Sequence, residues 1–359
     1  MTAAWQRWKR GRTNSLGFSL YLSTFAGQWS TLAGWTGTGT PVFLSLHISE
    51  EFDETYCRRA EEVCRMLASH GFRVIADVSR KTMEQFGCAD LVELANRLEL
   101  WALRIDYGFD RSEIAAMAEK MPIVLNASTV TAEDAAVIAG RGREVYAMHN
   151  FYPRPETGLD EDYLLATTRT LQSAGLKVLA FIPGDEWLRG PVFEGLPTLE
   201  AHRGMLPSAA FADLAIRYGM DGIFVADPGL SRTKADRIRM FCQEGVLCLP
   251  VQLDEDYSHL YDRVLTCRID SPKRLIRILE SREYSCKGQT VTPQNCTTRF
   301  LGAVTIDNEK YGRYTGEIQI TRSDLNADSR VNVIGRVPEA ACSLLPLIGG
   351  GQKFMFVRP

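Results

Sequence analysis

Short, continuous apolar runs alternate with longer amphipathic stretches along most of the chain, beginning at Leu16. Each run spans about four to eight residues, is rich in β-branched or aromatic side chains, and stops at polar or turn-forming residues. Continuous runs of this length are typical of strands that are buried on both faces of a parallel sheet. The eight runs begin at Leu16, Val42, Arg73, Leu100, Pro122, Glu144, Lys177 and Gly222.

The stretches between these runs have the pattern of amphipathic helices. Residues 50–71 open with acidic side chains and close on Gly71, as a capped helix does. An apolar stripe at helical spacing leaves a charged face for solvent. Residues 160–175 and 208–219 repeat this pattern, and each of them also ends at a glycine.

Eight strands with intervening helices over roughly 225 residues have the size of a (β/α)8 barrel. The sequence therefore predicts an α/β protein with a TIM barrel at residues 16–242. A doubly wound open sheet is the competing interpretation, but no G-x-G-x-x-G follows the first run, which argues against its dinucleotide-binding version.

The pattern changes at about residue 243. Short apolar runs separated by Gly, Asn and Asp continue to the end of the chain. They predict a smaller β-rich domain at 243–359, either a barrel or a sandwich. Its one expected helix is 271–283 (SPKRLIRILESRE).

Composition narrows the class of protein. Hydrophobic residues make up 45% of the chain and charged residues 24%, which are ordinary values for a globular protein. The 41 Lys and Arg and the 44 Asp and Glu leave a net charge of -3, so no basic surplus favours nucleic acid or an anionic membrane. No stretch approaches the ~20 apolar residues of a membrane helix. The nine cysteines include no CxxC pair, which is typical of reduced thiols in a cytoplasmic protein.

Residues 1–15 differ from the rest because they carry four basic side chains and no acidic one. The apolar run that follows is shorter than the core of a signal peptide, which spans about 7–15 residues. We therefore expect a frayed basic tail without a catalytic role.

Polar residues gather where the predicted strands end, which is where a TIM barrel carries its reactive groups. They are Asp77, Arg104, Asp106, Asn126, His149, Asn150, Tyr152, Asp185, Glu186 and Asp227. Polar residues cluster at strand ends in any barrel, and Asp77 and Asp227 are equally well explained as caps of the next turn.

Two loops go beyond this ordinary pattern. Residues 149–159 (HNFYPRPETGL) follow the sixth run and combine aromatic and polar side chains with two prolines, which suits the wall of a sugar site. Residues 184–205 follow the seventh run and are longer than a usual connection, which indicates a lid or a substrate clamp.

Facing carboxyl groups in such a mouth favour acid/base chemistry on a glycosidic bond. One carboxyl protonates the leaving oxygen while the other attacks or activates water. Asp106 and a glutamate of 184–205 are placed for these roles. Metal and pyridoxal chemistry are less supported, because the chain has no HxH or HExxH motif and the first run has no lysine. We expect no cofactor and no metal.

A phosphate in the ligand would need basic groups. Each arginine taken alone is better explained as a surface ion pair, so their convergence is what matters. The candidates in the barrel are Arg104, Arg154, Arg189 and Arg203, and those in the second domain are Arg282, Arg299 and Arg313.

At these loops the sequence resembles the 6-phospho-N-acetylmuramidase family. The motifs that carry the resemblance are RIDYGF (104–109), HNFYPRPETGL (149–159), GPVFEGLPTLEAHR (190–203), GAVTIDNEKYGRYTGEIQI (302–320) and DSRVNVIGRV (328–337). The resemblance implies a TIM barrel followed by a cyclophilin-like β-barrel domain. It also implies cytosolic hydrolysis of the bond between 6-phospho-N-acetylmuramic acid and N-acetylglucosamine during cell-wall recycling.

The side-chain chemistry of individual residues suggests their roles in such a reaction. We expect Asp106 and Glu200 to be the working carboxyl pair, with Glu186 and Glu194 as alternatives for the second member. The expected substrate-binding residues are Asp77, Arg104, Asn126, His149, Asn150, Tyr152, Arg154, His202 and Arg203, with Asp307 and Asn308 closing the pocket from the second domain. A simple β-turn explains the last two equally well.

The expected partner is a small phosphorylated amino sugar, with no nucleic acid and no membrane; the sequence does not fix an oligomeric state. The alternative function is a non-catalytic protein that binds a sugar phosphate or a peptide. A carboxylate-rich mouth argues against it, because buried carboxylates cost stability unless they are used.

Overall fold

The computed structural model describes residues 15–46, 55–141, 144–281 and 290–359. The chain divides into two compact units, one within Arg7–Ala235 and the other containing Asp236–Pro359. The basic tail up to residue 14 and the candidate Arg282 lie outside the described residues.

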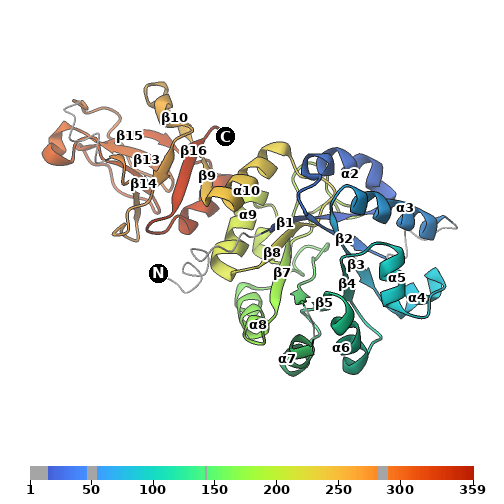
Figure 1. The fold of residues 1–359 in the computed structure, drawn as a ribbon. Helices are drawn as coiled ribbons and strands as arrows, with labels where there is room; N and C mark the ends of the chain where they lie inside the picture. The colour runs from blue at the N-terminus through green and yellow to red at the C-terminus, as the bar shows by residue number, and fades with distance from the viewer. Residues whose placement is uncertain (1–14, 47–54, 142–143, 282–289) are drawn as a thin grey trace. The chain divides into compact units, whose positions relative to one another are not determined.

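Eight parallel strands close into a barrel in chain order, which confirms the predicted TIM barrel (Figure 1). The barrel closes between its first and last strands, where Leu16 pairs with Ile223 and Phe18 with Val225. The strands are β1 (Ser15–Leu20), β2 (Pro41–Ser45), β3 (Arg73–Val78), β4 (Ala102–Ile105), β5 (Ile123–Asn126), β6 (Val145–Met148), β7 (Lys177–Ile182) and β8 (Gly222–Val225).

The inside of the barrel is filled by side chains. Phe181 and Phe43 form a T-shaped pair with ring centroids 5.4 Å apart, and Phe181 and Phe151 form another at 5.1 Å. Ile75, Val124 and other buried apolar residues complete this cluster. Because the lumen is packed, a ligand can reach the barrel residues only at its mouth.

Helices follow most of the strands, and a glycine with positive φ lies at the end of each of the three predicted ones, with Gly175 (φ +94°) after the helix expected at 160–175. The helix expected at 50–71 ends near Gly71, whose φ is +78°. The helix expected at 208–219 passes into a π-helical turn (Leu214–Tyr218) and ends at Gly219 with φ +66°. Only glycine adopts such φ values without strain. The helices are α2 (Phe25–Leu32), α3 (Tyr56–Ser69), α4 (Arg80–Phe86), α5 (Leu91–Arg97), α6 (Arg111–Lys120), α7 (Ala132–Arg141), α8 (Glu161–Ser173), α9 (Pro207–Asp213) and α10 (Arg232–Glu244).

The second unit is built on two sheets. One has the strand order β10-β15-β13-β14-β12, and the other has the order β11-β16-β9. The strands are β9 (Val246–Pro250), β10 (Gln252–Leu253), β11 (Val264–Thr266), β12 (Leu275–Arg277), β13 (Ala303–Asp307), β14 (Ile318–Thr321), β15 (Val331–Arg336) and β16 (Lys353–Val357). The sequence-based prediction of a smaller β-rich domain is confirmed.

The helix predicted at 271–283 is wrong over residues 271–280. Residues 275–277 form β12, and Ile276 pairs with Ile320 of the neighbouring strand. Ile276 and Ile278 are buried, whereas Arg277 between them is only partly buried. This alternation of burial at every second residue is typical of a strand. Pairing with β14 therefore overrides the local helical preference of this segment.

Candidate functional site

A pocket of about 370 Å³ opens at the mouth of the barrel. The predicted candidates that line it come from the carboxyl ends of three strands: Asp77 from β3, Arg104 and Asp106 from β4, and Asn150 and Tyr152 after β6. Phe43, Ser45, Phe151, Phe181 and Arg189 complete the lining. Parallel strands thus bring together side chains that are far apart in sequence.

Arg104 is the cation that organises this pocket. Its side chain is buried, and its Nη1 lies 2.6 Å from Oδ1 of Asp77 and 3.7 Å from Oδ1 of Asp106. Its Nη2 donates to Oδ1 of Asn150 at 2.5 Å. Charge-assisted contacts of this kind offset the cost of burying the guanidinium. Arg104 therefore fixes the two carboxylates.

Asp106 is the more exposed of the two carboxylates. Its side chain is 24% exposed, against 8% for Asp77. Asn126 at the end of β5 donates to its Oδ1 at 2.9 Å, and Oδ1 of Asn126 accepts from the backbone of Ser128. Asn126 thus holds Asp106 in place without lining the pocket itself.

Glu200 ties two loops together outside this pocket. Its carboxylate accepts from Nε and Nη2 of Arg203, and from the backbone N–H groups of Glu156 and Gly158. These bonds, led by the Arg203 guanidinium, lower the pKa of Glu200 to about 2. A Cβ on Gly158 would lie 2.5 Å from Oε2 of Glu200, so only glycine allows this approach.

Arg203 also contributes to the contact between these two loops. Its Nη1 donates to the backbone of Gly195 at 2.9 Å and its Nη2 to the backbone of Tyr152 at 3.0 Å. Its side chain is 11% exposed. The guanidinium thus joins the 149–159 loop to the 184–205 loop instead of facing the pocket.

The two candidate histidines are buried core groups. His149 contacts the hydroxyl of Thr168, and burial lowers the pKa of His149 to about 4. Nε2 of His202 lies 2.8 Å from Oδ2 of Asp213. Both imidazoles are fully buried and neither lines the barrel-mouth pocket.

The carboxylate of Asp227 accepts hydrogen bonds from the backbone of the 184–205 loop. Its buried carboxylate accepts from the backbone N–H groups of Gly184, Arg189 and Leu196 at 2.9 to 3.1 Å. Burial raises the pKa of Asp227 although these three bonds oppose the shift. A single carboxylate at the end of β8 therefore anchors the loop that follows β7.

A second pocket of about 470 Å³ adjoins the first through Arg189, which lines both. Its wall includes Tyr21, Thr24 and Trp187. The guanidinium carbon of Arg189 lies 4.2 Å from the centre of the Tyr21 ring, a cation–π contact that orients it. The other predicted loop residues, Glu186, Glu194 and Arg154, are exposed.

Two family models match successive parts of the chain. The model described as "6-phospho-N-acetylmuramidase, N-terminal" matches residues 16–240, and its C-terminal counterpart matches residues 247–357. The chain belongs to the 6-phospho-N-acetylmuramidase family.

Two solved structures that resemble this chain over nearly its whole length are described as proteins without a known function. A conserved protein of unknown function from Enterococcus faecalis is 32% identical, with 96% of each chain covered and a TM-score of 0.83. A Bacillus cereus protein is 22% identical over 96% of this chain and 99% of its own, with a TM-score of 0.78. A search of curated proteins gave no match.

The two predicted site residues of the second unit, Asp307 and Asn308, are buried inside that unit. Asp307 is buried at the end of β13, and burial, helped by Glu317, raises its pKa to about 7. Asn308 is fully buried and donates to Oδ1 of Asn332 and to the backbone of Ser329. Their expected role in closing the barrel site stays a prediction.

Sequence reasoning left one feature of the site unassigned and missed another. Arg189 was one of several arginines, and only the structure shows that it lines both pockets. Phe43 and Ser45 of β2 were not considered because the polar pattern of that run is weak. Within the described part of the chain, no helix is long and apolar enough to cross a membrane, and no group of three or more metal-ligating side chains forms.

Proposed function

We propose that the barrel mouth hydrolyses the glycosidic bond between 6-phospho-N-acetylmuramic acid and N-acetylglucosamine, as a step of cell-wall recycling in the cytoplasm. The observation that carries the proposal is the placement of Asp106 beside Asp77 and Arg104 in a pocket that adjoins a second pocket. Membership of the family supports the class of reaction.

Asp106 is the group that we assign to the reacting bond. It is the more exposed carboxylate of the pocket, and Asn126 and Arg104 fix its position. A positioned carboxylate of this kind acts on a sugar as an acid, a base or a nucleophile. Among the described residues that line the pocket, Asp77 is the other carboxylate, so we place it in the pair where the sequence suggested Glu200.

Other acidic residues are also candidates for the second carboxylate of the pair. Residues 47–54 follow β2 in the sequence and include Glu50, Glu51, Asp53 and Glu54, but they lie outside the described residues. Amide substitutions at these four positions therefore form one series with Asp77 and Asp106. We expect loss of Asp77, as of Asp106, to abolish turnover without loss of folding; the same result at one of the four other positions instead of at Asp77 would identify that residue as the partner of Asp106.

Arg189 is the group that we assign to the anion of the substrate. Its side chain lies against Tyr21 and lines both pockets, so a disaccharide that fills them would pass beside it. Arg104 is engaged by Asp77 and Asn150, and Arg203 by Glu200. A guanidinium suits a phosphate or a carboxylate because it presents two donors in one plane.

The first experiment compares turnover of a chromogenic N-acetylmuramic acid 6-phosphate glycoside with that of its unphosphorylated twin. We expect cleavage of the phosphorylated compound and loss of that cleavage in Asp106→Asn. Arg189→Ala should raise KM for the phosphorylated substrate about tenfold or more, with Arg189→Lys between the two.

Other outcomes contradict separate parts of this proposal. Equal cleavage of both compounds would keep the reaction and remove the anion site at Arg189. Cleavage of neither by folded protein would remove the glycosidase and favour a protein that binds a sugar phosphate or a peptide.

A further inference from the structure

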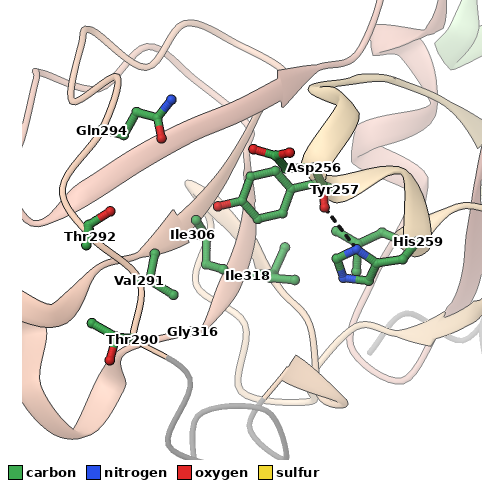
Figure 2. Close-up of a pocket in the computed structure, with 11 residues that line it drawn as sticks. Asp256, Tyr257, His259, Thr290, Val291, Thr292, Gln294, Ile306, Gly316 and Ile318 are labelled. Atoms are coloured by element: carbon green, nitrogen blue, oxygen red, sulfur yellow. Dashed lines mark hydrogen bonds between the residues drawn. The ribbon is translucent and has the colours of Figure 1, made fainter.

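A separate pocket of about 490 Å³ lies within the second unit (Figure 2). One side is the 3-10 helix η6 (Glu255–Leu260), and the opposite side is the segment 290–294. Its size is within the range of small-molecule sites. The proposed hydrolysis at the barrel does not use it.

The floor of this pocket is apolar. Leu260, Ile306 and Ile318 are buried, and Val291 adds a partly buried side chain at the edge. The half-buried ring of Tyr257 lies above this floor, and its hydroxyl points toward the 290–294 segment (Figure 2). Burial raises the pKa of Tyr257, so the phenol keeps its proton and can donate.

Uncharged polar side chains stand around this floor. Thr290, Thr292 and Gln294 are exposed, and their side chains make no hydrogen bond within the described part of the protein. Nδ1 of His259 lies 3.2 Å from the backbone oxygen of Asp256. Hydroxyl and amide groups can donate and accept in turn, which matches the hydroxyl and acetamido groups of a sugar.

In the free protein, hydrogen bonds with the side chain of Asn332 fix the backbone of the polar wall. Oδ1 of Asn332 accepts from the backbone of Gln294, and its Nδ2 donates to the backbone of Thr292 at 2.8 Å. Buried Asn308 donates to the same Oδ1 of Asn332. A backbone fixed in this way loses little conformational entropy on binding.

The charge of the pocket indicates which ligands it accepts. None of its described lining residues is lysine or arginine, and Asp256 is among them. Asp254 and Glu255 precede Asp256 in the sequence, so acids begin the helix that forms one side. Among the described lining residues, an acidic edge without lysine or arginine disfavours a phosphate.

We propose that this pocket is a second carbohydrate site that binds an uncharged, unphosphorylated N-acetyl amino sugar of one or two rings. The Tyr257 ring and the isoleucine floor would contact the C–H face of the sugar. Thr292, Gln294 and the Tyr257 hydroxyl would bond its polar edge. The site would thus select against the phosphorylated sugar that we assign to the barrel.

The test measures binding of di-N-acetylchitobiose to the full-length protein by titration calorimetry. Tyr257→Ala should weaken the binding about tenfold or more, and Gln294→Ala and Thr292→Val, both at exposed side chains, should each weaken it severalfold. Tyr163→Ala, on α8 of the barrel unit and 49% exposed, is the matched control and should not change it. Arg189→Ala should not change it either.

Three results would overturn this proposal. The first is unchanged affinity in Tyr257→Ala and Gln294→Ala. The second is equal binding of N-acetylglucosamine 6-phosphate at a site that these variants weaken, and the third is tighter binding of cationic glucosamine there. Turnover of the chromogenic phosphorylated glycoside should stay within about twofold of wild type in Gln294→Ala. Failure of the barrel reaction and failure of the second site are therefore separate outcomes.

Discussion

At the scale of single residues, two carboxylates that the sequence paired have different environments. Asp106 lines the pocket, where it accepts from Asn126 and lies beside Arg104, whereas Glu200 is surrounded by Arg203 and two backbone N–H groups. With its pKa near 2, Glu200 has no proton to give at neutral pH. Its oxygens are also occupied by these donors. We therefore assign Glu200 a positioning role.

Amide substitutions distinguish these roles. Asp106→Asn should lower kcat by about 10²–10⁴-fold while the fold is kept. Glu200→Gln should lower the free energy of unfolding by about 1–2 kcal/mol, because it loses a charged partner of Arg203, and should lower kcat/KM about tenfold or less. Steady-state kinetics across pH and urea unfolding measure both effects.

The exposed glutamates supply the controls for this pair. Glu186→Gln and Glu194→Gln should change neither stability nor turnover, because both side chains are exposed. If Glu200→Gln were as inactive as Asp106→Asn, with unchanged stability and a lost limb in the pH profile, the sequence-based pair of Asp106 and Glu200 would be restored.

At the scale of elements, the 184–205 loop depends on the strand that comes after it. Asp227 at the end of β8 bonds the loop at its start, at Arg189 and at Leu196. Gly184 fits there because a Cβ would lie 2.2 Å from the backbone oxygen of Gly229. The loop is thus long but fixed, as the sequence suggested for a clamp.

Asp227→Asn should loosen this loop. An amide has one oxygen for three N–H donors, and its own NH₂ group would face donors. We expect the free energy of unfolding to fall by about 1–3 kcal/mol, and kcat/KM to fall about tenfold or more as Arg189 loses its position. Urea unfolding, limited proteolysis and kinetics measure these effects.

Asp160→Asn is the matched control for this substitution. Asp160 is exposed at the start of α8 and its side chain makes no capping bond, so this change should have no effect. Unchanged protease sensitivity and turnover in Asp227→Asn would show that the loop does not depend on the carboxylate.

At the scale of the whole molecule, a buried acid gives stability a pH dependence. Asp307 has a folded pKa of about 7, against an ordinary value of 3.8. The unfolded chain releases this proton near pH 4, whereas the folded chain keeps it until about pH 7. Its contribution to stability is therefore complete below about pH 4 and is lost as pH rises through 7.

Asp307→Asn should remove this dependence of the free energy of unfolding on pH. The amide stays neutral at every pH, so the variant should be more stable than wild type at pH 8, by an amount on the order of 3 kcal/mol. Urea unfolding between pH 5 and 8, followed by a probe of the second unit, measures the difference. Asp262→Asn, at a side chain that is 71% exposed, is the control and should keep the wild-type slope. A variant as pH-dependent as wild type would contradict the assignment.

The sequence by itself determined the barrel. Its eight apolar runs each became a strand, because a strand buried on both faces needs apolar residues at every position and leaves a pattern that is visible locally. It also determined which strand ends carry polar groups. The sequence therefore predicts one cluster that contains Asp77, Arg104, Asp106, Asn150 and Tyr152, and these five residues line the barrel-mouth pocket.

Tertiary structure alone decided how these groups are used. Residues 275–277 are helical by local preference and a strand by pairing with β14. Whether a carboxylate faces substrate, as Asp106 does, or is engaged by an arginine, as Glu200 is, depends on neighbours that are distant in sequence. His149 and Arg189 show the same dependence, because burial and convergence are properties of packed elements and not of residue type.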